Sequence, residues 1–324
     1  MPSEPSPIRK YGVFALKAAI SLGLVAYIVA RADLSAVMSS IELANLGLIA
    51  LAIGLQVLGA GIISIRWSLL LSEHDVRPGL PYLFGSTLAS IFVRQFMPSI
   101  IGGDALRAHD AWRAGAGKGL AVVSLVVDRL LGLAALAIFA LIAVAYFGTE
   151  LLDLGNLWIW LIAGAGLIAA LLALTFIRLP GGGTQQSDPV SKPARILRKF
   201  TDALSLYQGR YRVLLPTFAL SVLLQINVVV FYWILSEALG LGVPFPAFFV
   251  IVPLAIFVMM APVSINGIGL REAIFVLLLG LWAVDESAAL AFAWVEFATV
   301  LVMGVIGGIV FALRRTRPAA IREL

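Results

Sequence analysis

The sequence predicts an all-α polytopic membrane protein, with about six transmembrane helices and two re-entrant hairpins that form an inverted repeat. Hydrophobic residues make up 61% of the 324 residues and charged residues only 13%, whereas a soluble domain is about half apolar and about a quarter charged. The mean hydropathy is +1.03. Apolar runs of about 20 residues, long enough to cross a bilayer, recur along the chain, and one motif occurs twice. We therefore expect one transmembrane domain over residues 1–324.

The same composition excludes several kinds of site. The chain has no cysteine and only two histidines, His74 and His109, so disulfides and thiolate metal sites are excluded and a histidine-based metal site is not expected. The sequence contains no P-loop or nucleophile motif, and no metal or cofactor is predicted. The net charge of +5 fits the excess of Lys and Arg in the cytoplasmic loops of membrane proteins, so it requires no nucleic-acid partner.

The repeated motif lies around Pro98 and again around Pro262. When the two prolines are aligned, the next nine positions align without a gap, and five of the ten positions are identical. Arg107 then falls on Arg271. Proline ends a helix and glycine permits unusual backbone angles, so both motifs predict a break in an apolar segment.

Eight apolar segments follow one another along the chain. The first repeat, about 11–148, holds four of them, and the second repeat, about 156–313, holds the other four. The run 11–30 has the length of a span and no convincing cleavage site, so it is expected to be an uncleaved helix. The remaining predicted spans are 43–71, 120–147, 157–177, 213–239 and 288–313, and the two broken segments are 80–106 and 245–283.

The charged connections predict the orientation of these segments. The N-terminus, the connection 178–212 and the C-terminus are basic, whereas 149–155 and 283–287 are acidic. Because basic loops face the cytoplasm, both termini and both ends of 80–106 are expected to be cytoplasmic. Two crossings need about 40 residues, so this short segment is expected to be a re-entrant hairpin. The segment 245–283 mirrors it from the outer face, either as a hairpin or as two short spans.

The tips of the two hairpins are the predicted substrate site. Non-helical backbone at membrane depth persists only where it is buried in protein or lines a wet cavity, and broken segments of this kind are typical of transporters with inverted repeats. A helix that starts after each tip would direct free amides and a positive dipole end into the cavity. This arrangement suits a phosphate or a carboxylate, and the alternative is a structural break with a snorkelling arginine. The candidate substrate-binding residues are Gly102, Gly103, Asp104 and Arg107 at the first tip, and Asn266, Gly267, Gly269 and Arg271 at the second.

Charged residues near or within the predicted spans form a second set of candidates. A charge at the centre of a span costs about 2.5–3.5 kcal/mol on insertion scales, so such a residue suggests a function. Asp128 and Glu296 each lie on the helix that follows a hairpin. Together with Arg129 and Glu272 they are candidates for charge balance or proton coupling. A structural ion pair, such as Asp128 with Arg107, explains the pattern equally well.

Arg66 and Arg94 are secondary candidates. Arg66 lies near the end of its predicted span, where an arginine is expected to be an interfacial anchor. Arg94 would lie deep in the first hairpin and needs a partner, such as Asp104. His109, which is next to Asp110, is expected to be solvated in the connection that follows the hairpin.

Together these residues resemble a known family, the lysylphosphatidylglycerol synthase transmembrane region, or flippase-like domain, which also occurs as stand-alone polytopic proteins. The resemblance covers about residues 10–315. Two positions depart from the family pattern, which usually has asparagine shortly before the first proline and commonly has glycine where Asn266 stands. The stretches that carry the resemblance are Pro98-x-x-x-Gly102-Gly103-Asp104-x-x-Arg107, then Asp128-Arg129, then Pro262-x-x-x-x-Gly267-x-Gly269-x-Arg271-Glu272.

The resemblance implies a bacterial inner-membrane protein that moves phospholipids or related anionic lipids between leaflets. Two-domain members of the family carry a soluble aminoacyltransferase domain after the membrane region. Because this sequence ends at Leu324, soon after the last predicted span, we expect a lipid translocator and not an enzyme. The expected partner is membrane phospholipid, and a second copy of the chain or a separate lipid-synthesising enzyme are further options.

Two other functions are compatible with the sequence. One is a membrane-embedded lipid-modifying transferase, or its accessory subunit, that acts on a polyprenyl or hopanoid lipid with Asp104 and Asp128 as catalytic or metal-binding residues. The other is a transporter of a small ion or solute. For the translocator, the lipid headgroup is expected in a central hydrated cavity, where Arg107 and Arg271 bind its phosphate. Asp128 and Glu296 would balance these charges or take up protons.

Overall fold

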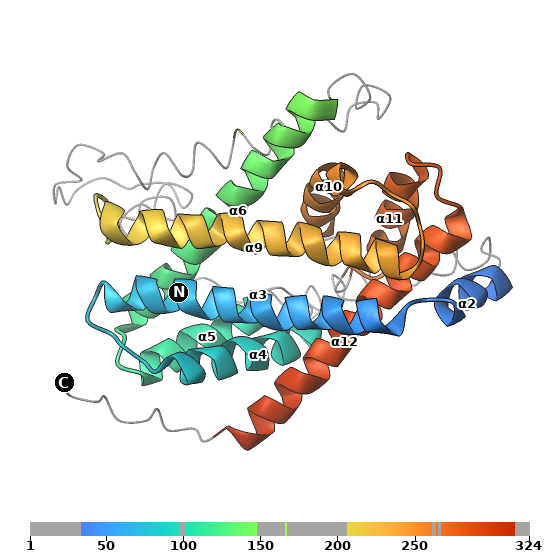
Figure 1. Ribbon diagram of the computed structural model, residues 1–324. Helices are drawn as coiled ribbons and strands as arrows, with labels where there is room; N and C mark the ends of the chain where they lie inside the picture. The colour runs from blue at the N-terminus through green and yellow to red at the C-terminus, as the bar shows by residue number, and fades with distance from the viewer. Residues whose placement is uncertain are drawn as a thin grey trace, which may run out of the picture. The chain divides into compact units, whose positions relative to one another are not determined.

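The computed structural model describes residues 34–96, 101–147, 206–260 and 267–314, together with the single residues 166 and 264. All regular structure within these residues is helical (Figure 1), which confirms the predicted fold class. The predicted span 11–30 lies outside the described residues, as does 157–177 apart from residue 166. Most of the basic connection 178–212 and both proline positions of the repeated motif also lie outside them.

Four long apolar helices in the described part of the chain are long enough to cross a membrane. A bilayer core about 30 Å thick needs about 20 helical residues, and these helices have 27, 30, 28 and 28 residues. They coincide within two or three residues with four of the predicted spans, so the chain is a multi-pass membrane protein. The helices are α3 (Leu46–Ser72), α6 (Lys118–Phe147), α9 (Tyr211–Ala238) and α12 (Glu286–Leu313).

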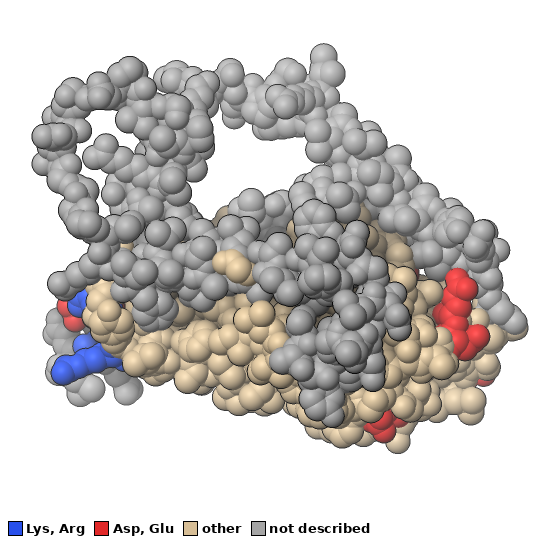
Figure 2. Space-filling view, turned by 90° about the horizontal axis from the view of Figure 1, so that it is seen from above, with Lys and Arg blue, Asp and Glu red and all other residues tan. Residues whose placement is uncertain are grey.

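The surfaces of the long helices are apolar, as a lipid environment requires. Large hydrophobic side chains are exposed along them, for example Leu51, Leu58, Leu215 and Ile309. Among the described residues visible in Figure 2, charged side chains are few and lie toward the two ends. Pro216 lies inside α9 without ending the helix, which neighbouring helices make tolerable in a membrane.

The first broken segment is a hairpin of two short helices, α4 (Leu80–Phe96) and α5 (Ile101–Arg113). The hydroxyl groups of Ser86 and Tyr82 donate to the carboxylate and the backbone carbonyl of Asp110, at 2.7 and 3.1 Å. Residue 110 of α5 thus lies beside the start of α4, so the two helices run antiparallel. Helices of 17 and 13 residues rise only about 25 and 20 Å at 1.5 Å per residue.

His109 and Asp110 lie in a stretch that was expected to be a connection, but both belong to α5. Helix α5 continues to Arg113, and Asp110 is 4% exposed, whereas His109 is exposed. The physical reason is the Ser86 hydroxyl on α4, which donates to the Asp110 carboxylate, because a buried carboxylate needs a hydrogen-bond partner. Asp110 therefore joins the two helices of the hairpin.

The second broken segment also consists of short helices. A 3₁₀ turn, η2 (Phe245–Ala247), leads into α10 (Phe248–Met260), and α11 (Leu270–Gly280) packs against α10 and α12. Figure 1 shows α10 and α11 close together. Helices of 13 and 11 residues are too short to cross a bilayer separately.

One described helix was not predicted. α2 (Leu34–Glu42) lies in a stretch that was expected to be a connection. It packs against α12, with Val37 buried in a cluster with Leu290 and Ala291. Val37 and Ile41 are four residues apart and share one face of the helix. An apolar pattern this short is harder to recognise in a sequence than a full apolar span.

The chain forms two compact units. Unit 1 comprises residues 1–59, 88–105 and 227–314, and unit 2 comprises residues 60–87, 106–226 and 315–324. Each unit therefore combines segments from both halves of the sequence. The division into two sequence repeats stays a prediction.

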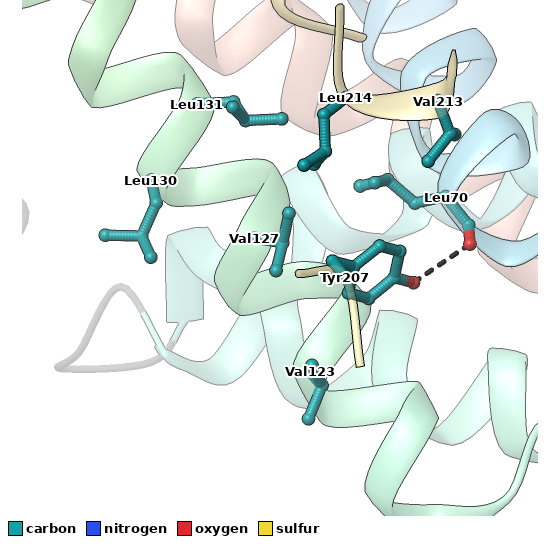
Figure 3. Packing of buried hydrophobic residues seen from close by; sticks show 8 residues of the cluster. All are labelled: Leu70, Val123, Val127, Leu130, Leu131, Tyr207, Val213 and Leu214. Carbon is teal, nitrogen blue, oxygen red and sulfur yellow. Dashed lines mark hydrogen bonds between the residues drawn. The ribbon is translucent and has the colours of Figure 1, made fainter. Parts of the chain in front are cut away.

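A core of unit 2 joins α3, α6, the first turn of α9 and Tyr207 before it. The buried side chains drawn in Figure 3 come from Leu70, Val123, Val127, Leu130, Leu131, Tyr207, Val213 and Leu214. The Tyr207 hydroxyl donates to the Leu70 carbonyl at 2.9 Å. Beside it, the Arg210 guanidinium contacts the Glu73 carboxylate at 2.6 Å, and the rings of His74 and Tyr207 lie edge to face at 5.0 Å.

His74 predicts a pH dependence for this end of unit 2. Burial, and then the positive charge of Arg210, lower the pKa of His74 below its ordinary value of 6.5. The unfolded chain therefore binds a proton first, so the stability that His74 contributes is complete above about pH 6.5 and is lost as the pH falls below it. Its Nε2 is buried without a hydrogen-bond partner among the described residues, which disfavours a proton there.

We expect His74→Gln to reduce the loss of thermal stability between pH 7.5 and pH 5.5, because glutamine cannot be protonated. The measurement is the unfolding temperature of wild type and variant at several pH values in this range. An identical pH dependence in the two proteins would contradict this expectation.

Candidate functional site

Three charged side chains meet inside unit 2. Arg66 comes from α3, Arg107 from α5 and Asp128 from α6, and they are 2%, 4% and 5% exposed. Nη2 of Arg66 lies 2.7 Å from Oδ1 of Asp128, and Nη1 of Arg107 lies 3.6 Å from Oδ2. Nη2 of Arg66 also donates to the backbone carbonyl of Asp128 at 2.5 Å. We call these three residues the Asp128 cluster.

The Asp128 cluster carries more positive than negative charge. Two guanidinium groups share one carboxylate, which leaves a formal charge of +1. Guanidinium groups are strong hydrogen-bond donors to anions such as carboxylates and phosphates. The guanidinium of Arg107 also stacks on the Trp67 ring at 4.5 Å, and the Trp67 indole N–H donates to Ser124 at 3.3 Å.

The expectation that Arg66 is an interfacial anchor was wrong. It lies six residues before the end of α3, but its side chain turns into unit 2 and is almost completely buried. The physical reason is Asp128, whose buried carboxylate attracts both arginines. The predicted ion pair of Asp128 with Arg107 is present, at the longer of the two distances.

A second cluster of buried charge lies in unit 1. Nε of Arg271, on α11, is 3.0 Å from Oε2 of Glu296 on α12. The Tyr232 hydroxyl of α9 is 3.3 Å from the other carboxylate oxygen. The Arg271 guanidinium carbon lies 4.6 Å from the centre of the Phe297 ring. We call Arg271, Glu296 and Tyr232 the Glu296 cluster.

The two clusters differ in their balance of charge. Arg107 and Arg271, which the repeated motif aligns, each face a carboxylate on the helix after their hairpin. The Glu296 cluster contains one arginine and one carboxylate, and the buried Glu272 carboxylate also acts electrostatically on Glu296. In unit 2, Arg66 adds a cation that the motif does not contain.

The start of α11 explains why glycine stands at two motif positions. Gly267 and Gly269 have φ of +76° and +82°, a region that side chains other than glycine rarely adopt. The Glu272 carboxylate accepts a hydrogen bond from the Gly269 amide at 2.7 Å, so Glu272 caps the helix that this turn begins. Glu272 was predicted to act in charge balance or proton coupling. In the structure, its carboxylate accepts a hydrogen bond from a backbone amide at the start of α11.

The other predicted site residues lie outside both clusters. Gly103 packs so closely on α4 that a Cβ at this position would lie 2.6 Å from the Ser90 carbonyl oxygen. Arg129 is exposed on α6. Asn266 lies outside the described residues. Gly102, Asp104 and Arg94 are half-buried, in the first turn of α5 or the last turn of α4.

The described residues contain no group of three or more His, Cys, Asp or Glu side chains that could hold a metal ion. Asp128 contacts two guanidinium groups, which compete with any cation for its oxygens.

These features define a polytopic α-helical membrane protein with short helices next to buried arginine–carboxylate clusters. The family described as the lysylphosphatidylglycerol synthase TM region matches residues 14–308, and the chain belongs to this family. This confirms the resemblance that the sequence motifs indicated and supports a role related to membrane lipids. No curated protein matched the chain.

Proposed function

We propose that this protein moves an anionic phospholipid, or a related anionic lipid, between the leaflets of the bacterial inner membrane, with both termini in the cytoplasm. It carries out no chemical reaction on the lipid. The observation that carries the proposal is the Asp128 cluster, in which two buried arginines share one carboxylate within the helices of a membrane protein. Membership of the family supports a lipid as the substrate.

The mechanism follows from the charge of the Asp128 cluster. A lipid phosphate that enters the protein loses its hydration, and this loss is unfavourable unless cations replace the water. Arg66 and Arg107 provide those cations, while Asp128 holds both guanidinium groups in place when no lipid is bound. The acyl chains need not enter, because the outer surfaces of the helices are apolar.

The Glu296 cluster has a supporting role in this proposal. Its arginine faces the Glu296 carboxylate, and the buried Glu272 carboxylate adds negative charge nearby, so the cluster has no excess positive charge for an anion. We assign its ion pair a structural role, in which Arg271 and Glu296 hold α11 against α12. Arg271 is accordingly the weaker of the two motif arginines as a phosphate ligand.

Loss of transport in Arg107→Ala is the expected result of the principal experiment. The protein is reconstituted in liposomes, and movement of fluorescent phosphatidylglycerol from one leaflet to the other is measured. Removal of Arg107 lowers the formal charge of the cluster from +1 to 0, so transport should fall by about tenfold or more, which corresponds to one charge-assisted hydrogen bond.

The matched control is Arg113→Ala, because Arg113 is exposed on the same helix and should be dispensable. Wild-type rates in folded Arg107→Ala would contradict the assignment of the site. Movement no faster than in protein-free liposomes, for any phospholipid, would contradict the proposed function.

The transferase alternative gains no support from the described residues. It requires a carboxylate available to a metal ion or a reacting proton, and Asp128 is held by two arginines. Asp104 lies in the first turn of α5 and is half-buried. A new lipid species formed by the purified protein in the presence of a divalent metal would favour this alternative.

A further inference from the structure

Four helices of unit 2 have their ends close together. A buried cluster contains Leu71 near the end of α3, Leu83 near the start of α4, Ala111 near the end of α5 and Ala121 near the start of α6. Helices α3 and α6 are long enough to cross a membrane, so this group of ends marks one membrane surface. The last turn of α5 and the first turn of α6 therefore lie at the level of the lipid headgroups.

Trp112 lies in the last turn of α5 and is 47% exposed. Tryptophan combines an apolar ring with a polar indole N–H, and it is enriched where the hydrocarbon layer meets the headgroups. Leu80 at the start of α4 and Val122 on α6 are also exposed, at 45% and 54%, so this end of unit 2 presents apolar surface. The environment that suits Trp112 is the boundary between hydrocarbon and headgroups.

Two neighbouring side chains hold the Trp112 ring. Nζ of Lys118, the first residue of α6, lies 5.2 Å from the centre of the ring, within the distance of about 6 Å that a cation–π contact requires. The His109 ring meets the same ring edge to face, with 5.8 Å between the ring centres. Trp112 and Lys118 therefore form a pair of defined geometry, although both are exposed.

The Lys118 ammonium group is available to an anion. Within the part of the chain that the structure describes, no carboxylate lies within salt-bridge distance of it. Asp110, at the same end of α5, is buried and accepts a hydrogen bond from Ser86. An ammonium group has three donors, so hydrogen bonds to a phosphate can add to its contact with the Trp112 ring.

We propose that Trp112 and Lys118 form a binding site for the headgroup of an anionic phospholipid in the leaflet at this end of unit 2. The Lys118 ammonium binds the phosphate, and the Trp112 indole N–H donates to an ester oxygen. The Trp112 ring packs against the glycerol backbone and the upper acyl chains. The occupant follows from charge complementarity, because basic residues at a membrane surface attract anionic lipids. This inference goes beyond the proposed function, since the site holds a lipid at the surface and requires no movement between leaflets.

A single fluorescent label can report which lipid lies beside this pair. The chain contains no cysteine, so an introduced cysteine is unique. Gly117 is a suitable position because it is exposed, adjoins Lys118 in sequence, and a Cβ there meets nothing within 4 Å. The full chain with Gly117→Cys is labelled and placed in phosphatidylcholine nanodiscs. Each sample contains a small fraction of either phosphatidylglycerol or phosphatidylcholine with a spin label at the top of one acyl chain, and the ratio of the two quenching efficiencies measures the preference for the anionic lipid.

We expect the labelled protein with Trp112 and Lys118 intact to prefer phosphatidylglycerol. Lys118→Gln should lower this preference by about fivefold, the usual contribution of one basic residue at an anionic surface. Trp112→Ala leaves the net charge unchanged but removes the ring that positions the ammonium group, so it should lower the preference to a similar extent. Thermal unfolding of each variant confirms that it is folded.

The matched control is Arg113→Gln, which removes the same charge from an exposed residue next to Trp112 and should keep most of the preference. Equal losses in Lys118→Gln and Arg113→Gln would overturn the site, because they would show attraction by net charge alone. Equal quenching by the two lipids when Trp112 and Lys118 are both present would overturn it as well.

The last comparison separates a lipid from a soluble phosphate ester. Glycerol phosphate, compared with sodium chloride at equal ionic strength, should leave the preference unchanged, and loss of the preference would overturn a lipid as the ligand. Lipid movement in liposomes is a separate measurement. A preference for phosphatidylglycerol without movement would support this site and contradict the proposed function, whereas movement without a preference would do the reverse.

Discussion

Arg271→Ala should destabilise the protein by about 3–5 kcal/mol, the usual cost of removing one partner from a buried ion pair. Arg271 and Glu296 are 7% and 4% exposed, and their side chains meet at 3.0 Å. Without Arg271, the Glu296 carboxylate keeps the Tyr232 hydroxyl but loses its neighbouring cation. The stability loss should appear as a lower unfolding temperature in detergent or nanodiscs.

The matched comparison is Arg107→Ala, which should be much less destabilising. Asp128 retains Arg66 at 2.7 Å after this change, so the remaining charges balance. The double variant Arg271→Met with Glu296→Gln removes both charges and should recover much of the lost stability, since an apolar replacement of a buried pair is often neutral. Equal unfolding temperatures for the two alanine variants would contradict the different charge balance of the two clusters.

Gly307→Ala should be the most disruptive single methyl addition in α12. A Cβ at Gly307 would lie 2.2 Å from the carbonyl oxygen of Leu88 on α4. The Leu88 atom is part of the backbone of α4, and the added Cβ is fixed to the backbone of α12. No flexible side chain can therefore move to relieve the contact. Overpacking of this kind costs about 1–3 kcal/mol and occasionally more, and we expect the upper end of that range.

The control for this helix contact is Gly54→Ala, because a Cβ at Gly54 meets nothing within 4 Å. Alanine at an open helix position should be neutral or slightly stabilising. Both variants are compared with wild type by thermal unfolding under the same conditions. A Gly307→Ala protein as stable as Gly54→Ala would show that α12 and α4 do not pack this closely.

The long helices could be predicted from the sequence because a bilayer requires long apolar runs. Leu46–Ser72 and Glu286–Leu313 need no partner to be recognised. The helix breaks could be predicted as well, because proline and glycine act locally. α2 (Leu34–Glu42) could not, since its formation depends on packing against α12.

The candidate site was predictable only in part. The motif marked Arg107 and Arg271, and the apolar spans marked Asp128 and Glu296. Arg66 lies 62 residues from Asp128 in sequence, and no local pattern links them. A count of the charged residues within the predicted spans would have pointed to Arg66. If Asp128 pairs with Arg107 alone, Arg66 has no partner in its apolar helix.

The caps and the hairpin contacts differ in the same way: a cap involves residues that are close in sequence, whereas a hairpin contact joins residues on two helices. Asp285 before α12 is a recognisable cap, and its carboxylate accepts from the Ser287 amide at 2.9 Å. Asp110 gave no such signal, because its partner Ser86 lies on the other helix of the hairpin. Local chemistry could be predicted, whereas contacts between distant segments required the structure.

The most direct test of the excess positive charge is a comparison of Arg107→Ala with the double variant Arg107→Met, Asp128→Asn. The single variant leaves the Asp128 cluster with a formal charge of 0, whereas the double variant retains Arg66 alone and restores +1. Movement of fluorescent phosphatidylglycerol is measured in liposomes that contain equal amounts of folded protein. We predict that the double variant transports this lipid faster than the single variant. A double variant that is folded but no faster than Arg107→Ala would contradict the claim that excess positive charge at Asp128 binds the lipid.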